Sequence, residues 1–202
     1  ELVRNGLIGR VRQVEVGLPK GPNMIKGDPT EEDRSGREDY QLWTGPAPML
    51  PYVHARHHQM WRVHLAYGGG QLMDWIGHHN DIAHWGLGLD ATGGGGGPIS
   101  VEAQNWDYSK TPEIYDTAYD YDVISKYPND IEVKISSRLK MGCKWIGTNG
   151  WIWVTRGRYE ASNPEWIAKG FKTGKYRAYE SPGHQRNFID SVKSRKETAA
   201  PA

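Results

Sequence analysis

Several features that mark common protein classes are missing from this sequence. Its single cysteine, Cys143, can form neither an internal disulfide nor a zinc site with several thiolates, so we expect it to lie in the core. No apolar run approaches the roughly 20 residues that a membrane-spanning helix needs, and the first residues lack a signal-peptide pattern. We therefore predict a soluble chain, cytoplasmic or periplasmic, without a membrane partner.

An excess of charge of either sign is missing as well. The 25 Lys and Arg residues nearly balance the 24 Asp and Glu residues, for a formal net charge of +1. This balance gives no electrostatic reason to expect nucleic acid as a partner. The length of 202 residues suits one domain with a full core better than two small ones. We predict a single domain over residues 1–202.

A phosphate-binding motif is not found in these residues. The glycines of Gly93–Gly97 are not accompanied by the Lys and Ser/Thr of a P-loop, and no G-x-G-x-x-G follows a predicted strand. We expect instead that Gly88 ends a helix and that Gly93–Gly97 forms a flexible crossing. The sequence therefore indicates no cofactor-binding residues in this chain.

Alternation of apolar and polar residues is abundant and predicts strands. The alternating stretches are Val14–Leu18, Ile99–Ala103, Tyr115–Tyr121, Ile131–Ile135 and Trp151–Thr155. Short connections at Asn129–Asp130 and Thr148–Gly150 favour hairpins over helical crossovers, and hence an antiparallel sheet. A last helix is predicted from about Pro182 to the basic residues Lys193–Lys196.

Rows of tyrosine and tryptophan on the predicted strands have two interpretations. Aromatic rows on a sheet can stack against sugars, or they can pack on helices and form a subunit interface. We favour packing or an interface, and we predict a homo-oligomer through the sheet face that is rich in Tyr and Trp.

The stretch Trp61–Gly88 carries the chemistry that this sequence best supports. Apolar residues of Gln71–Gly86 recur at helical spacing and share one side of a predicted helix. Asp74 and His78 lie on another side, one turn apart, and Asp81 extends this stripe. A carboxylate beside an imidazole can fix the tautomer of the ring and raise its basicity, so that the ring can take a proton from a hydroxyl.

Polar and aromatic residues are dense around this helix. An Asp/His pair on a helix is more often a surface pair or a structural hydrogen bond, and a glycine triplet such as Gly68–Gly70 is usually a turn. The glycines would nevertheless let a ligand approach the backbone. The mixture of side chains suits a sugar pocket: Arg62, His64, Tyr67, Asp74, His78, His79, Asp81 and His84 alternate with Trp61, Trp75 and Trp85.

The adjacent histidine pairs offer a metal site as an alternative. His57 and His58 could join His78 and His79, but neighbouring imidazoles point in different directions, whereas helical metal sites use one-turn spacing. We predict no metal.

Ordered motifs in this chain resemble a known oxidoreductase family. They are WTGPAP at Trp43–Pro48, then WR, YGGG and DWIGHHNDIAHW, followed by IGTNGWIWVTRGRYEAS at Ile146–Ser162 and HQRNFIDSVKSRK at His184–Lys196. The sequence resembles the C-terminal domain of the glucose-fructose oxidoreductase, inositol dehydrogenase and MocA (Gfo/Idh/MocA) family. The resemblance implies an α+β fold, with a mostly antiparallel open sheet and helices packed on one face. Relative to the family, we expect truncation at both ends.

The resemblance also implies a function. The chain would be the substrate-binding and oligomerising half of an NAD- or NADP-dependent oxidoreductase acting on a sugar, polyol or related cyclic alcohol. In the family, the Asp and His of a D-x-x-x-H pattern lie beside the substrate, and these map onto Asp74 and His78. His78 would relay the hydroxyl proton, while Asp74 would orient His78 or the substrate. Arg62, Tyr67 and His79 are weaker candidates for substrate contacts.

Two departures from the family limit this inference. The family's separate Rossmann domain, with its catalytic Lys in an E-K-P motif, is missing from these residues, so the resemblance does not make this chain an enzyme by itself. Many relatives have Gly two positions after the Asp, where this chain has Ile76. Two alternatives remain: a stand-alone carbohydrate-binding or dimerisation module, and a cofactor-independent lyase or hydrolase that uses the histidine-rich cluster.

Overall fold

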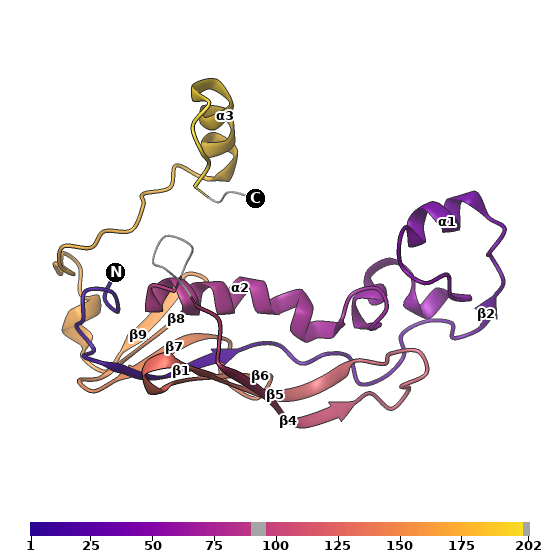
Figure 1. Cartoon of the computed structure of the whole chain (residues 1–202), viewed down its shortest axis with the longest axis horizontal. Helices are drawn as coiled ribbons and strands as arrows, with labels where there is room; N and C mark the ends of the chain where they lie inside the picture. Colours follow the sequence, from indigo (N-terminus) through magenta and orange to yellow (C-terminus); the bar gives the residue numbers. More distant parts are fainter. Residues whose placement is uncertain (90–95, 200–202) are drawn as a thin grey trace.

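The fold is built on one seven-stranded sheet (Figure 1). The computed structural model describes residues 1–89 and 96–199. The strands are β1 (Val11–Gly17), β4 (Ser100–Tyr108), β5 (Ala118–Tyr127), β6 (Ile131–Ser136), β7 (Gly142–Gly147), β8 (Trp151–Thr155) and β9 (Arg158–Ala161). Their order is β4-β5-β6-β1-β7-β8-β9. Every neighbouring pair is antiparallel except β1 and β6, which are parallel, so the predicted, mostly antiparallel α+β sheet is confirmed.

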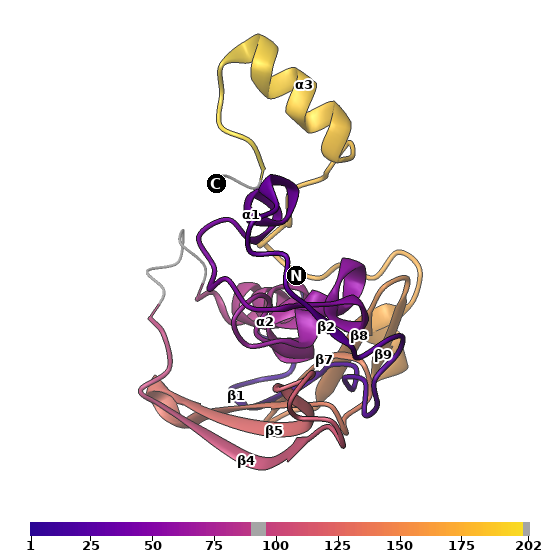
Figure 2. The same ribbon diagram turned by 90° about the vertical axis from the view of Figure 1, so that its right-hand side faces the viewer.

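One long helix lies on this sheet. The helix α2 (Gly70–Leu87) crosses one face, and the opposite face carries no other element in the described part of the chain (Figure 2). An extension beyond one end of the sheet holds the strands β2 (Glu31–Glu32) and β3 (Tyr52–Val53) and the helix α1 (Glu38–Thr44). The helix α3 (His184–Ser194) stands away from the sheet on an extended segment (Figure 1). The sheet face under α2 therefore forms the main core.

Packing between α2 and the sheet is tight and specific. The thiol of Cys143 donates a hydrogen bond to the carbonyl oxygen of His79 at 2.9 Å, and the indole Nε1 of Trp145 donates to that of Ala83 at 3.3 Å. Both side chains are at most 4 % exposed. Because each bond joins β7 to α2, they fix the helix on the sheet, and the predicted core position of Cys143 is confirmed.

The aromatic rows divide between different environments. Tyr121 and Tyr127 pack in the core with Ala83 of α2. Trp151 and Trp153 instead lie beneath Lys144 and Lys140, whose ammonium nitrogens are 4.8 and 3.5 Å from the respective ring centroids. No single sheet face therefore collects all the Tyr and Trp residues. Aromatic residues lie on both faces of the sheet because alternate residues of a strand point to opposite sides, and association through one of these faces stays a prediction.

The ends of the helices follow the predicted signals. Gly88 ends α2 in the left-handed conformation, and its N–H bonds to a carbonyl of the last turn. The crossing predicted for Gly93–Gly97 falls mostly outside the described residues. No helix in the described ranges is long and apolar enough to cross a membrane.

Candidate functional site

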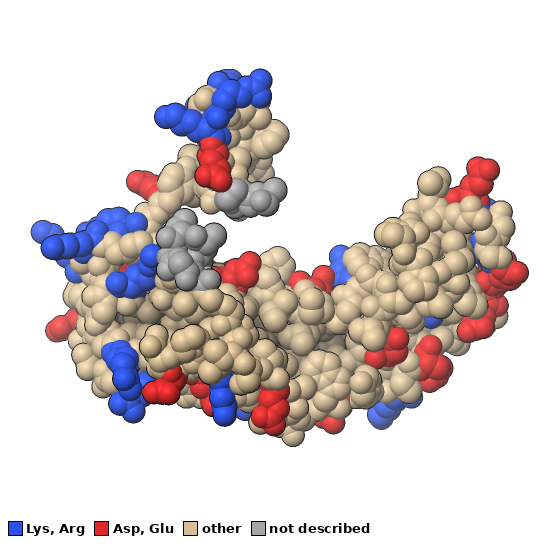
Figure 3. Space-filling model, in the orientation of Figure 1, with Lys and Arg blue, Asp and Glu red and all other residues tan. Residues whose placement is uncertain are grey.

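Asp74, His78 and Asp81 form an exposed stripe on α2, as the helical spacing predicted. His79 and Ala83 on the other side of the helix are buried against the sheet. Figure 3 shows the molecule hollowed above α2, between the part that carries α1 and the raised helix α3. The stripe therefore lies on the side of α2 that is exposed to solvent, away from the sheet.

The carboxylate of Asp74 is held by Arg62. The Nε of Arg62 donates to Oδ1 of Asp74 at 3.1 Å, and its Nη1 donates to the carbonyl oxygen of Gln59 at 3.1 Å. Its guanidinium also lies 4.9 Å from the ring centroid of Trp61. The structure thus brings together two of the predicted site residues. The guanidinium is always charged, so it provides a stronger partner for the carboxylate than a neutral imidazole does.

His78 lies one turn from Asp74, but the expected contact between them is not formed. Among the described residues, the imidazole of His78 instead contacts the ring of Trp75. The two ring centroids are 5.4 Å apart in an edge-to-face arrangement. The imidazole is exposed and keeps its polar atoms available. His78 is therefore exposed on the stripe and has no carboxylate partner among the described residues.

The predicted substrate contact of His79 does not fit its position. Its ring is only 2 % exposed, and Nδ1 lies 3.1 Å from the carbonyl oxygen of Gly17 in β1. Burial lowers the pKa of this imidazole. Because residue 79 falls on the sheet side of α2, its hydrogen bond joins the helix to β1, and it does not face the hollow.

Tyr67 lies just before α2 and contacts the segment that carries α1. Its hydroxyl donates to the carbonyl oxygen of Pro48 at 3.3 Å, and its ring lies 5.3 Å from that of Trp43. His57 packs against the same indole at 4.8 Å. Tyr67 therefore anchors the extension that forms one wall of the hollow.

The glycines before α2 are required by the protein's own packing. A Cβ at Gly68 would approach the backbone of Arg62 to 2.5 Å, and one at Gly70 would approach the side chain of Thr117 to 2.7 Å. Gly69 and Gly70 both have positive φ. The space at these glycines is thus filled by other parts of the chain and not by a ligand. This packing sets the position of Arg62 relative to Asp74.

Arg156 is a residue of this region that the sequence did not point to. It lies in the turn between β8 and β9, and its guanidinium carbon is 5.1 Å from the ring centroid of Trp75. Trp75 is the same residue that contacts His78. The motif around Arg156 was visible in the sequence, but only the folded sheet shows that its hairpin turn reaches α2.

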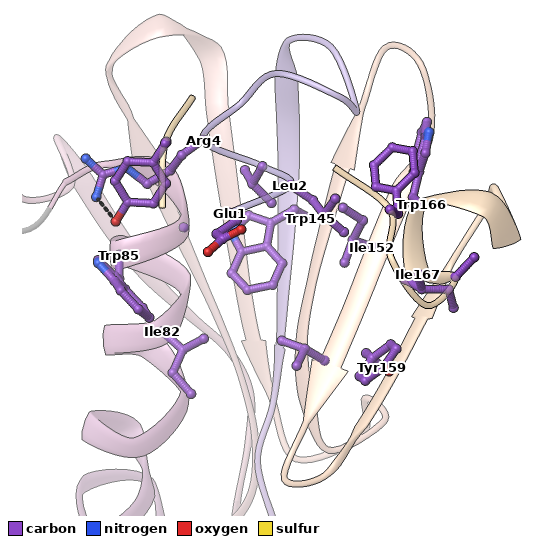
Figure 4. Close-up of a pocket in the computed structure, with 16 residues that line it drawn as sticks. Glu1, Leu2, Arg4, Ile82, Trp85, Trp145, Ile152, Tyr159, Trp166 and Ile167 are labelled. Atoms are coloured by element: carbon purple, nitrogen blue, oxygen red, sulfur yellow. Dashed lines mark hydrogen bonds between the residues drawn. The ribbon is translucent and has the colours of Figure 1, made fainter. Parts of the chain in front are cut away.

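An apolar cavity lies beside the C-terminal half of α2. It has a volume of about 450 Å³ and is lined by Ile82 and Trp85 on α2, by Trp145 and Ile152 on the sheet, and by Tyr159 and Trp166 (Figure 4). Its acid, Glu1, is bound by Thr173, Arg177 and Ala178, which together lower its pKa to about 2. The cavity is therefore suited to apolar contacts, whereas Asp74 and His78 lie on the exposed stripe of α2.

The first strand of the sheet does not lead through a phosphate-binding turn into a helix. The strand β1 is followed by a long loop and by the strand β2, whereas a phosphate-binding unit requires a glycine-rich turn that leads into a helix. The three glycines before α2 are occupied by packing contacts.

Comparison with known proteins identifies relatives of this chain. The sequence profile of a family described as "Oxidoreductase family, C-terminal alpha/beta domain" matches residues 2–137. No curated protein matches the chain. An aldose-aldose oxidoreductase from Caulobacter crescentus, in complex with glycerol, is similar in structure, with a TM-score of 0.54 and 17% identity over 99% of this chain and 50% of that one.

A second solved structure supports the same fold. It is an NAD-binding protein from Listeria innocua, with a TM-score of 0.50 and 18% identity over 98% of this chain and 51% of that one. This chain thus spans about half the length of both proteins. At these identities the likeness shows the fold alone.

Proposed function

This chain belongs to the C-terminal α/β domain of the Gfo/Idh/MocA oxidoreductases, and we propose that it is the substrate-binding half of an NAD- or NADP-dependent enzyme acting on a sugar, polyol or related cyclic alcohol. The observation that carries this proposal is the exposed stripe of Asp74 and His78 on α2, the helix above which the molecule is hollowed (Figure 3). The relatives of known structure have about twice the length of this chain. A dinucleotide-binding domain would complete the site.

In this proposal, His78 takes the proton of the substrate hydroxyl. Its imidazole is exposed, and the described residues give it no ion-pair partner, so a neutral ring nitrogen can accept the proton. Asp74 has its carboxylate fixed by Arg62 at 3.1 Å. The remaining acceptor capacity of the carboxylate and the N–H groups of Arg62 can then bind neighbouring hydroxyls and orient the ring.

We also propose that the chain self-associates through the sheet face opposite α2. This face is uncovered in Figure 2, and it carries Trp151 and Trp153 beneath lysines that pair with glutamates. Sedimentation at tens of micromolar should show a dimer or a larger assembly. A clean monomer would contradict this part of the proposal.

The substrate-binding role can be tested on this chain alone. Titration of the ¹⁵N-labelled chain with D-glucose and with myo-inositol should shift the side-chain signals of His78 and Arg62. The same titration with NAD or NADP should give no binding at micromolar concentrations, because no phosphate-binding turn leads into a helix. Micromolar affinity for either dinucleotide, or sugar shifts confined to the apolar cavity, would contradict the proposal.

A further inference from the structure

Trp75 connects two polar groups that come from distant parts of the chain. Its ring contacts the imidazole of His78 at 5.4 Å and the guanidinium of Arg156 at 5.1 Å. Arg156 and His78 also both lower the pKa of His79, in addition to its burial, which places them within electrostatic range of the same residue. The turn between β8 and β9 therefore places a cation on the same indole that the candidate catalytic imidazole contacts.

This cation has no internal counter-charge among the residues that the structure describes. Arg62, the other arginine near the stripe, is paired with Asp74 at 3.1 Å. Arg156 is exposed. In the part of the chain that the structure describes, its guanidinium contacts the indole of Trp75. Stacking on an aromatic ring orients the planar guanidinium but leaves its N–H groups free. Such a fork matches the two oxygens of a carboxylate or phosphate.

We propose that Arg156 is a specificity-determining residue that binds an oxyanion on the substrate, so that the preferred substrate is an acidic monosaccharide carrying a carboxylate or a phosphate. This proposal rests on the function proposed above. Trp75 would hold the guanidinium in place, and the acidic group would then set which hydroxyl of the sugar lies beside His78. The proposal assigns Arg156 to binding and orientation, and proton transfer remains with His78.

Binding to the chain itself tests this proposal. The probes are D-glucuronate, D-glucose 6-phosphate and neutral D-glucose, with affinities taken from the Arg and His side-chain signals of the ¹⁵N-labelled chain. We expect at least one acidic sugar to bind about tenfold or more tightly than glucose, because a bidentate ion pair is a strong hydrogen-bonding contact. The preference should weaken as salt is added. Which acidic sugar is preferred distinguishes carboxylate from phosphate.

Two variants of one hairpin provide the control. Arg156→Gln should abolish the preference, whereas Arg158→Gln removes the same charge from β9, and no contact of Arg158 with Trp75 is found in the described residues. Arg158→Gln should retain the preference. Thermal unfolding confirms that both variants fold. Equal affinity for all three sugars, a preference that survives Arg156→Gln, or no binding of either acidic sugar would overturn the proposal.

The two proposals fail in different ways. If glucose still shifts His78 and no acidic sugar is preferred, only the role of Arg156 is overturned. If none of the sugars, glucose included, shifts the signals of His78 and Arg62, the substrate-binding role of the chain is contradicted as well.

Discussion

The ring nitrogen Nε2 of His84 lies 2.5 Å from the hydroxyl of Tyr127, so a hydrogen bond joins α2 to the end of β5. Tyr127 is 4 % exposed. His84→Ala would leave a buried hydroxyl without this partner, so we expect it to lower the free energy of unfolding by about 1–3 kcal/mol. Tyr127→Phe removes only the hydroxyl and should cost less. Urea denaturation measures both, and an unchanged midpoint for His84→Ala would show that the bond contributes nothing.

Replacing either of two glycines of α2 by alanine should change the stability of the fold, but in opposite directions. A Cβ at Gly86 would lie 2.6–2.7 Å from the indole of Trp145, which is buried, so Gly86→Ala should destabilise the fold by about 1–3 kcal/mol. Gly77 is exposed, and a Cβ at this position would have no neighbouring atom within 4 Å. Gly77→Ala should therefore stabilise by about 0.5–1 kcal/mol. Thermal unfolding of both variants tests this packing of the helix. Stability changes of the same sign in both variants would contradict it.

The thiol of Cys143 should be unreactive in the folded protein. Burial raises the pKa of this thiol to about 12, and the group donates a hydrogen bond to His79 in α2. A maleimide at pH 8 should modify it only after unfolding, because thiolate is the reactive form. Rapid labelling of the native chain, followed by mass spectrometry, would show that β7 and α2 separate readily.

Stability should fall as the pH is lowered from about 7.5 to 5.5. Burial lowers the pKa values of His57, His79 and His84, whereas unfolded histidine titrates near pH 6.5. Below that pH the unfolded chain binds more protons than the folded chain, so the free energy of unfolding decreases with decreasing pH. Above about pH 7.5, histidine is neutral in both the folded and the unfolded chain, so these groups contribute no pH dependence. Urea midpoints at several pH values check this, and a rise in stability on acidification would contradict it.

Local patterns predicted the sheet and its helix well. Alternation located most of the strands, and helical spacing placed Asp74 and His78 on the exposed side of α2. Patterning of this kind is visible because one side of each element faces the core. The strand β7 was not anticipated, although it supplies Cys143 and Trp145 to the core.

Contacts between distant segments could not be predicted in the same way. The pairing of Asp74 with Arg62 depends on how the glycines before α2 turn the chain, and the contact of Arg156 with Trp75 depends on where a hairpin ends. The short helix α1 was also missed, because prolines in the segment after it favour an extended loop. These features are set by tertiary packing.

The most direct test of the central claim is the turnover of an enzyme that joins this chain to a dinucleotide-binding domain of the same family. His78→Ala should lower kcat by about a hundredfold or more, with a smaller change in KM, because a positioned acid or base acts mainly in the transition state. Asp74→Asn should be milder, and His184→Ala on the distant helix α3 serves as the control (Figure 1). Full kcat in a folded His78→Ala variant would contradict the proposed role of this stripe.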